Sequence, residues 1–302
     1  MTEIICITTY PPRECGIATF SDDLIHAIET KFACSFTIKV CALASSSEQH
    51  IYNDQVKYIL DTSKANEYNN IADRINEDSE VKMVLIQHEF GLYAEHKEAF
   101  LAFVHCIKKP VLIVFHTVLP HPPLTQKKYL IRLIDGCSAV IVMTQTSAGI
   151  LEGDYGIEKE KINIIPHGTH LVSHKDKKKL KAKYNVTGRR ILSTFGLLSP
   201  GKSIETTLEA LPAIIKKNPN VLFLIIGKTH PTIIKQVGET YRNMLQNKII
   251  ELGITHSVRF VNLYLELPIL LEYLQLTDVY LFTSDDPNQA VSGTLLYALS
   301  FE

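Results

Sequence analysis

The sequence of 302 residues contains no tryptophan and no long apolar run. Its longest apolar runs, such as VLFLIIG at 221–227, are far shorter than the ~20 residues needed to span a bilayer. The amino terminus, MTEIICITTYPP, has no basic residues before its apolar run, so it resembles a first strand more than a signal peptide. The six cysteines form no CxxC pair, which favours free thiols over zinc ligands. We therefore expect a cytoplasmic protein whose membrane association is at most peripheral.

The chain also lacks a charge excess of either sign, since its formal net charge is −1. This balance gives no general electrostatic reason to expect a nucleic-acid partner. The exception is the segment 171–188, which holds six lysines. A nucleic-acid site is possible there, but no aromatic residues are interleaved among the lysines, so a solvated linker helix is the preferred interpretation. We expect domains at 1–172 and 189–302, joined by a basic linker at 173–188.

Short runs that are apolar at every position recur along the chain, separated by longer amphipathic stretches. Such runs are typical of strands buried on both faces of a parallel sheet that helices cover. The first series predicts strands at IICIT, TIKVCAL, VKMVLI, PVLIVFH, AVIVMT and INIIP. The second predicts RILSTFG, VLFLIIG, SVRFVN and DVYLFTS. The predicted fold class is α/β, with two doubly wound, Rossmann-like domains, the second about two strands short of the common six.

Ligands of open parallel sheets bind beyond the carboxyl ends of the strands, so the residues that follow each strand are candidates. Gly16 precedes a predicted helix and would let backbone N–H groups approach a phosphate or sugar oxygen, although an ordinary turn would look the same. His88 and Glu89 follow one strand, and His116 follows another. A lone histidine at a strand end is more often structural than catalytic, but several polar side chains at neighbouring ends favour a site.

Lys202 follows the first strand of the second series, and we expect it in the first turn of a helix with an apolar stripe. A cation is unfavourable at a helix N-terminus unless an anion binds between the two, so Lys202 indicates a phosphate ligand. The alternative is a tolerated surface lysine. The segment GLLSPGKS at 196–203 has P-loop spacing, but Pro200 removes a backbone donor that such a loop needs.

Together these segments resemble the family 4 glycosyltransferases, which have the two-domain GT-B fold. YPPRECGIATF is similar to the family's first loop, with Gly16 approaching the donor, and FHTVLP places His116 beside the donor sugar. IIPHGTH is similar to the usual end of the first domain. FGLLSPGK is similar to the family's diphosphate-binding segment, with Lys202 on its lysine and Leu197 where an arginine is expected.

The last stretch, QAVSGTLLYA, is similar to a family signature with two glutamates separated by seven residues, here replaced by Gln289 and Tyr297. The resemblance implies catalytic roles for His116, Lys202 and Gln289, and acceptor-side roles for His88 and Glu89. The donor-binding residues that it implies are Gly16, Gly196, Lys202, Asn262, Gln289, Ser292, Gly293 and Tyr297.

By this resemblance, the protein moves a hexose from a GDP- or UDP-sugar to a carbohydrate or glycoconjugate acceptor, with retention, without a metal and without a cofactor. The acidic pair nearest to a metal motif is Asp285–Asp286. The signature lies close to residue 302, so we expect a C-terminally truncated second domain, loosely held residues 285–302 and little transfer. A nucleotide-sugar-binding protein without transfer activity is the main alternative. The segments HTVLP and FGLLSPGK argue against a sugar epimerase of similar fold.

Overall fold

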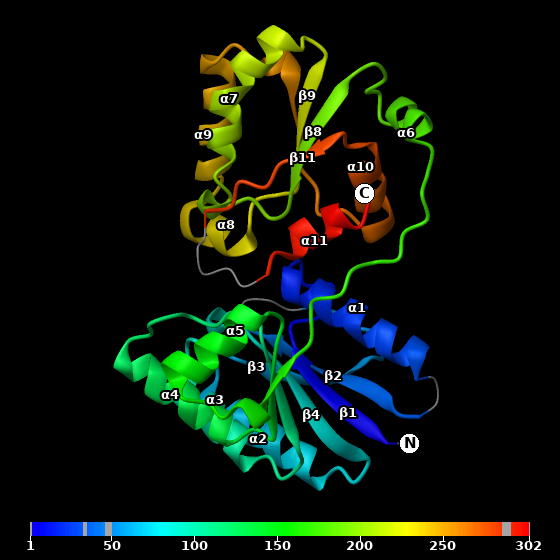
Figure 1. Cartoon of the computed structure of the whole chain (residues 1–302). Coiled ribbons are helices and arrows are strands. Elements are labelled where there is room, and N and C mark those ends of the chain that lie inside the picture. Colours follow the sequence, from blue (N-terminus) through cyan, green and yellow to red (C-terminus); the bar gives the residue numbers. More distant parts are fainter. Residues whose placement is uncertain (1, 33–34, 46–49, 286–290, 302) are drawn as a thin grey trace. The chain divides into compact units, whose positions relative to one another are not determined.

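A computed structural model of the protein describes residues 2–32, 35–45, 50–285 and 291–301. The chain divides into unit 1 (Met1–Gly168 with Asn288–Val291) and unit 2 (Thr169–Pro287 with Ser292–Glu302). Each unit contains one parallel sheet with helices packed against it (Figure 1). The predicted α/β class with two Rossmann-like units is therefore confirmed. None of the helices in the described ranges is both long and apolar enough to cross a bilayer.

The sheet of unit 1 has the strand order β3-β2-β1-β4-β5-β6-β7. All six strand pairings are parallel. The order reverses between β1 and β4, which makes their carboxyl ends the expected ligand-binding edge. Its strands are β1 (Glu3–Thr8), β2 (Thr37–Ala44), β3 (Val56–Asp61), β4 (Val81–His88), β5 (Val111–Phe115), β6 (Ala139–Val142) and β7 (Ile162–Ile164).

Both faces of the central strands of this sheet are buried because these strands are apolar at almost every position. One face packs against the buried stripes of α2, α3 and α4, and the other packs against α1, whose Phe20, Leu24 and Ile28 lie on that core. The helical segments of unit 1 are α1 (Gly16–Lys31), α2 (Ala65–Glu77), η1 (Phe90–Tyr93), α3 (Lys97–Cys106), α4 (Leu124–Asp135), α5 (Gln145–Ile150), η2 (Leu151–Tyr155) and η3 (Lys159–Lys161).

The sheet of unit 2 has the order β10-β9-β8-β11, and its reversal point lies between β8 and β11. The strands are the four that the sequence predicts: β8 (Arg190–Phe195), β9 (Val221–Ile226), β10 (Val258–Val261) and β11 (Val279–Tyr280). The helical segments are α6 (Lys177–Lys183), η4 (Pro200–Lys202), α7 (Ile204–Lys217), α8 (Pro231–Val237), α9 (Thr240–Glu251), η5 (Thr255–Ser257), α10 (Leu267–Leu276) and α11 (Gly293–Leu299).

The lysine-rich segment differs from the solvated linker helix that the sequence suggests. It contains α6, whose Leu180 is only 4% exposed and belongs to the core of unit 2. Its amines bind acidic groups of the same unit: Lys183 contacts Glu272 at 2.5 Å and Lys181 contacts Asp278 at 2.6 Å. The lysines are therefore partly neutralised by unit 2 rather than presented to a polyanion.

Candidate functional site

The backbones of Gly196 and Gly227 lie in close contact at the carboxyl ends of β8 and β9 in unit 2. We call this contact the glycine crossing. Gly196 and Gly227 have φ angles of +130° and +128°, which side-chain-bearing residues rarely adopt. A Cβ atom on Gly227 would lie 2.1 Å from the carbonyl oxygen of Gly196. The backbones can approach this closely only because both positions lack a side chain.

Lys202 lies beside this crossing. Its Nζ atom would be 3.6 Å from a Cβ atom placed on Gly196, so the amine occupies the space beside that glycine. The side chain is half-buried, and burial lowers the pKa of Lys202. No carboxylate in the described part of the chain lies within ion-pair distance of it. A partly desolvated cation without a counter-charge is suited to bind an anion.

The position of Lys202 differs in one respect from the prediction. It ends the short turn η4 and precedes α7, with Ser203 between them in the left-handed region at φ 45°. The predicted stripe on α7 is present, with Ile204, Leu208 and Leu211 buried. Pro200 opens η4 and offsets the lysine from the helix by one tight turn.

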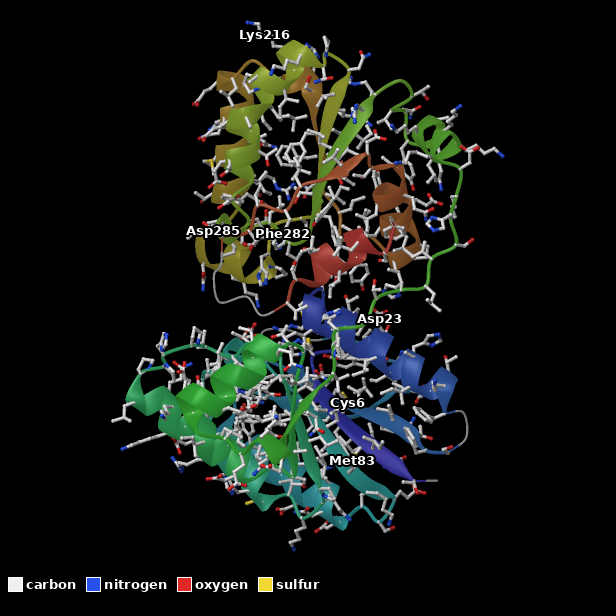
Figure 2. The ribbon with its side chains drawn as sticks, in the orientation of Figure 1. Cys6, Asp23, Met83, Lys216, Phe282 and Asp285 are labelled. Atoms are coloured by element: carbon white, nitrogen blue, oxygen red, sulfur yellow. The ribbon has the colours of Figure 1, made fainter. Side chains whose placement is uncertain are left out.

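The loop that carries Lys202 is held by the segment that follows β11. Thr283 Oγ1 donates to the carbonyl oxygen of Lys202 at 2.7 Å, and Ser284 Oγ donates to that of Gly201 at 3.1 Å. The N–H of Asp285 also donates to Gly201, at 3.3 Å. Figure 2 labels Phe282 and Asp285 on this segment. These bonds fix the loop at the reversal point between β8 and β11, where a ligand is expected.

The other predicted donor-binding residues of unit 2 lie at two places. Asn262 directly follows β10 and is exposed. Ser292 caps α11 by accepting the N–H of Leu295, and Gly293 is the first residue of that helix. Gln289 lies outside the described residues.

Tyr297 has a partner within unit 2. Its hydroxyl lies 3.0 Å from His170 Nε2, and its ring is in edge contact with Phe195, at the end of β8. It is thus near the strand end but already bonded to the segment that enters unit 2.

In unit 1, His116 directly follows β5 and its side chain is half-buried. Its Nε2 atom lies 2.8 Å from Gln87 Oε1, and its ring meets Phe20 of α1 edge-on at 5.0 Å. Gly16 begins the same helix, four residues before Phe20, and has open space around its Cα. Burial, followed by the charge of His167, lowers the pKa of His116 to about 4. The imidazole is therefore neutral near pH 7.

The two predicted acceptor-side residues, His88 and Glu89, differ in burial. β4 extends two residues beyond the predicted strand, so Gln87 and His88 pair with β5. His88 is 1% exposed among aromatic rings, and burial lowers its pKa to about 3. We therefore assign His88 to the core, which corrects the expectation of a ligand contact. Glu89 is half-buried and accepts a bond of 2.7 Å from Thr117, beside His116.

Comparisons with known proteins identify the architecture. HepE from Anabaena, solved with UDP and glucose, superposes on this chain with a TM-score of 0.73 and 16% sequence identity. The superposition covers 100% of this chain and 79% of HepE. A UDP-forming α,α-trehalose-phosphate synthase from Burkholderia xenovorans superposes with a TM-score of 0.67 and 11% identity, over 100% of this chain and 82% of the synthase. Sucrose-phosphate synthase from Thermosynechococcus elongatus superposes with a TM-score of 0.68 and 12% identity, over 97% of this chain and 77% of that enzyme. The chain has the GT-B fold.

The sequence match is narrower than the structural one. Residues 176–296 match the family described as glycosyl transferases group 1. This range contains Lys202 and both glycines of the crossing. No curated protein matches the chain in sequence at a significant level.

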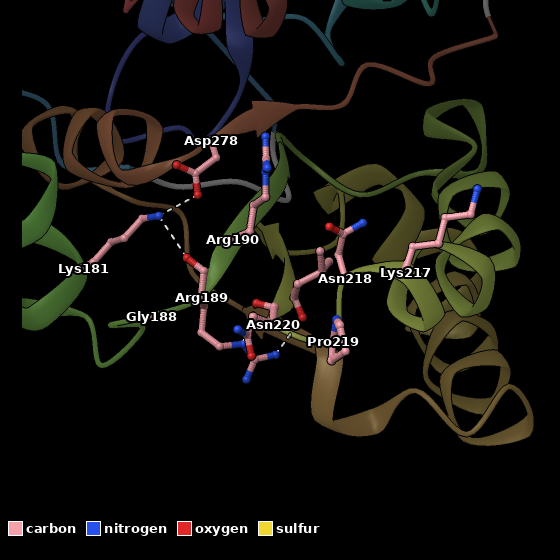
Figure 3. Close-up of a pocket in the computed structure, with 10 residues that line it drawn as sticks. Lys181, Gly188, Arg189, Arg190, Lys217, Asn218, Pro219, Asn220 and Asp278 are labelled. Carbon is pink, nitrogen blue, oxygen red and sulfur yellow. Dashed lines mark hydrogen bonds and ion pairs between the residues drawn. The ribbon is translucent and has the colours of Figure 1, made fainter.

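One groove of the GT-B chain lies away from these residues, at the amino ends of β8 and β9 (Figure 3). It encloses about 700 Å³. Arg189 donates to the carbonyl oxygens of Asn220, Val221 and His256, and Lys181 binds Asp278. Because these basic groups have partners and the carboxyl edge is opposite, we do not assign the groove to the site.

Three residues that shape the candidate site were not predicted. Gly227 follows β9 as Gly196 follows β8, and this repeated strand–glycine pattern could have indicated the crossing. Gln87 directly follows the predicted strand VKMVLI, and the structure includes it in β4. Arg242, only 5% exposed, donates to the carbonyl oxygen of Gly227 at 3.4 Å, and no local pattern identifies it.

Proposed function

We propose that this protein is a glycosyltransferase that moves a hexose from a GDP- or UDP-sugar to a carbohydrate or glycoconjugate acceptor. The match to glycosyl transferases group 1 supports this assignment, as does the similarity to HepE, which has been solved with UDP-glucose. The observation that carries it is the half-buried amine of Lys202, which lies beside Gly196 and has no ion-pair partner among the residues that the structure describes.

Transfer of a sugar from a nucleoside diphosphate builds negative charge on the leaving phosphate. Catalysis requires that this charge be stabilised more in the transition state than in the bound donor. In our proposal Lys202 supplies the positive charge, and the glycine crossing allows the diphosphate to approach the backbone closely. His116 hydrogen-bonds the sugar, with Gly16 near the donor. We expect retention of configuration and no requirement for a metal or an organic cofactor.

Binding of a nucleotide-sugar without transfer is the second candidate, and two observations favour it. Leu197 stands where the resemblance places a phosphate-binding arginine. The hydroxyl of Tyr297 is bonded to His170, although the resemblance places a ribose-binding carboxylate at this position. With these groups absent, Lys202 must provide most of the favourable charge.

Calorimetric titration of UDP, GDP and UDP-glucose into the parent protein and Lys202→Met tests the site. A charge-assisted contact is worth about 1.5–3 kcal/mol, so we expect affinity to fall roughly 10- to 150-fold. Lys216→Met, at an exposed position of α7, is the matched control and should bind like the parent. Equal affinity of the Lys202 variant and the parent for every nucleotide would show that the assignment is wrong.

A second assay separates transfer from binding. The parent is incubated with UDP- or GDP-hexoses and a panel of sugar acceptors, and released nucleotide and glycosylated product are both quantified. Product that depends on acceptor and is lost in Lys202→Met supports the transferase. Nucleotide binding with neither hydrolysis nor product supports the binding protein.

A further inference from the structure

The side chain of Gln87 is fully buried at the end of β4, directly beside the imidazole of His116. Its backbone is fixed by pairing with Val114 of β5 and by the hydroxyl of Tyr93, which donates to its carbonyl oxygen at 3.1 Å. Its Oε1 atom lies 2.8 Å from His116 Nε2. A residue held in this way offers the imidazole a partner at a fixed place.

The ring of His116 is also held on its other sides. Its backbone N–H donates to the carbonyl oxygen of His88 at 3.1 Å, and its ring edge packs on Phe20. Among the described residues, none forms a hydrogen bond with His116 Nδ1. Where the amide oxygen of Gln87 faces the ring, it can only accept, so the proton of a neutral ring lies on Nε2 and Nδ1 is left as an acceptor.

We infer that Gln87 is a positioning residue, which holds His116 as the Nε2–H tautomer so that Nδ1 accepts a hydrogen bond from a ligand hydroxyl. A bare nitrogen acceptor attracts a hydroxyl donor and offers nothing to a phosphate oxygen. The position therefore selects the sugar part of the substrate. The identity of this ligand rests on the proposed function, whereas the tautomer does not.

The groups around the ring favour the neutral form. His167 packs against Phe20, and a positive charge on His167 lowers the pKa of His116. His88, at the end of β4, is affected in turn, since a positive charge on His116 lowers the pKa of His88. A nearby acid, Glu89, is bonded to Thr117 and to the N–H of Phe90. Protonation of His116 would convert Nδ1 from an acceptor to a donor.

Nitrogen-15 NMR of histidine-labelled protein tests the tautomer without any substrate. The His116 signals are identified by their loss in His116→Asn, and we expect the Nε2–H pattern in the parent. Gln87→Glu keeps the shape and adds a negative charge about 3 Å away, so the pKa of His116 should rise by at least about one unit. A Nδ1–H pattern in the parent, or an unchanged pKa in the variant, would overturn the inference.

The transfer assay tests the role of the acceptor atom. In Gln87→Glu, kcat should fall at least about tenfold as the pH drops through the raised pKa of His116, while UDP affinity at Lys202 stays unchanged. A parental pH profile in this variant would refute the role in sugar positioning. If NMR shows the expected tautomer and no transfer is found with any donor, the inference on Gln87 stands and the proposed function fails.

Discussion

Replacing Gly227 with alanine tests the glycine crossing most directly. The new Cβ atom would lie 2.1 Å from the carbonyl oxygen of Gly196 and 2.9 Å from its carbon. Both are backbone atoms, so the clash cannot be relieved by rotating a side chain. Holding alanine at φ +128° costs about 1–3 kcal/mol, and overpacking a site costs about as much again. We therefore expect a loss of roughly 2–6 kcal/mol in the free energy of unfolding of unit 2.

Urea and thermal denaturation of parent and variant measure this loss. A change of this size should lower the melting temperature of unit 2 by at least about 5 °C. Gly253→Ala is the matched control, because its φ is +66° but an added Cβ atom has open space around it. It should show the conformational strain, about 1 kcal/mol, without the clash.

Nucleotide affinity should change together with stability. The Gly196 backbone must move to admit the new methyl group, and the amine of Lys202 lies beside that residue. We expect Gly227→Ala to weaken UDP binding, whereas Gly253→Ala should leave it unchanged. A Gly227 variant that melts and binds UDP like the parent would refute both the crossing and its link to Lys202.

Three further substitutions test charge and packing. Asp78→Asn should lower the free energy of unfolding by about 1 kcal/mol near pH 7, measured by denaturant titration, because Lys57 and Tyr58 lower the pKa of Asp78 to about 2. The parent should lose this stabilisation as the pH falls from about 4 towards 2. His88→Phe should remove acid lability, since the buried His88, with its pKa lowered to about 3, destabilises the fold by up to about 1.4 kcal/mol per pH unit below about 6.5. Glu272→Gln should release Lys183 and Tyr184, and limited proteolysis should then cut 171–188 faster than in the parent.

The sequence predicts the strands that have continuous apolar runs, such as β9, whose six residues are all buried. β3 was missed for the opposite reason. It lies at the edge of its sheet, Lys57 interrupts its apolar pattern, and Ile59 is 49% exposed. The partial burial and interrupted apolar pattern of β3 make its sequence signal weaker.

The candidate site was predictable only where a residue is unusual for its local position. Lys202 is recognisable because a cation near the start of a helix is unfavourable unless an anion binds beside it. The bond between Tyr297 and His170 joins residues 127 positions apart, and no local pattern contains it. The prediction for His88 is wrong because the predicted strand VKMVLI ends two residues before β4 does. A histidine beyond a strand end is expected to face a ligand, whereas one inside the strand is buried in the core.

The carboxyl edges of the two sheets carry different chemical groups. In unit 1, His116 is neutral and bonded to an amide, whereas in unit 2 Lys202 is a cation without a described counter-charge. Neutral acceptors bind hydroxyl groups, and cations bind phosphates. In the proposed enzyme, His116→Asn should therefore lower kcat at least about tenfold and leave the Kd for UDP within about twofold of the parent. Calorimetry and the transfer assay measure the two quantities separately. A variant that loses UDP affinity while keeping its kcat would contradict these separate roles of His116 and Lys202.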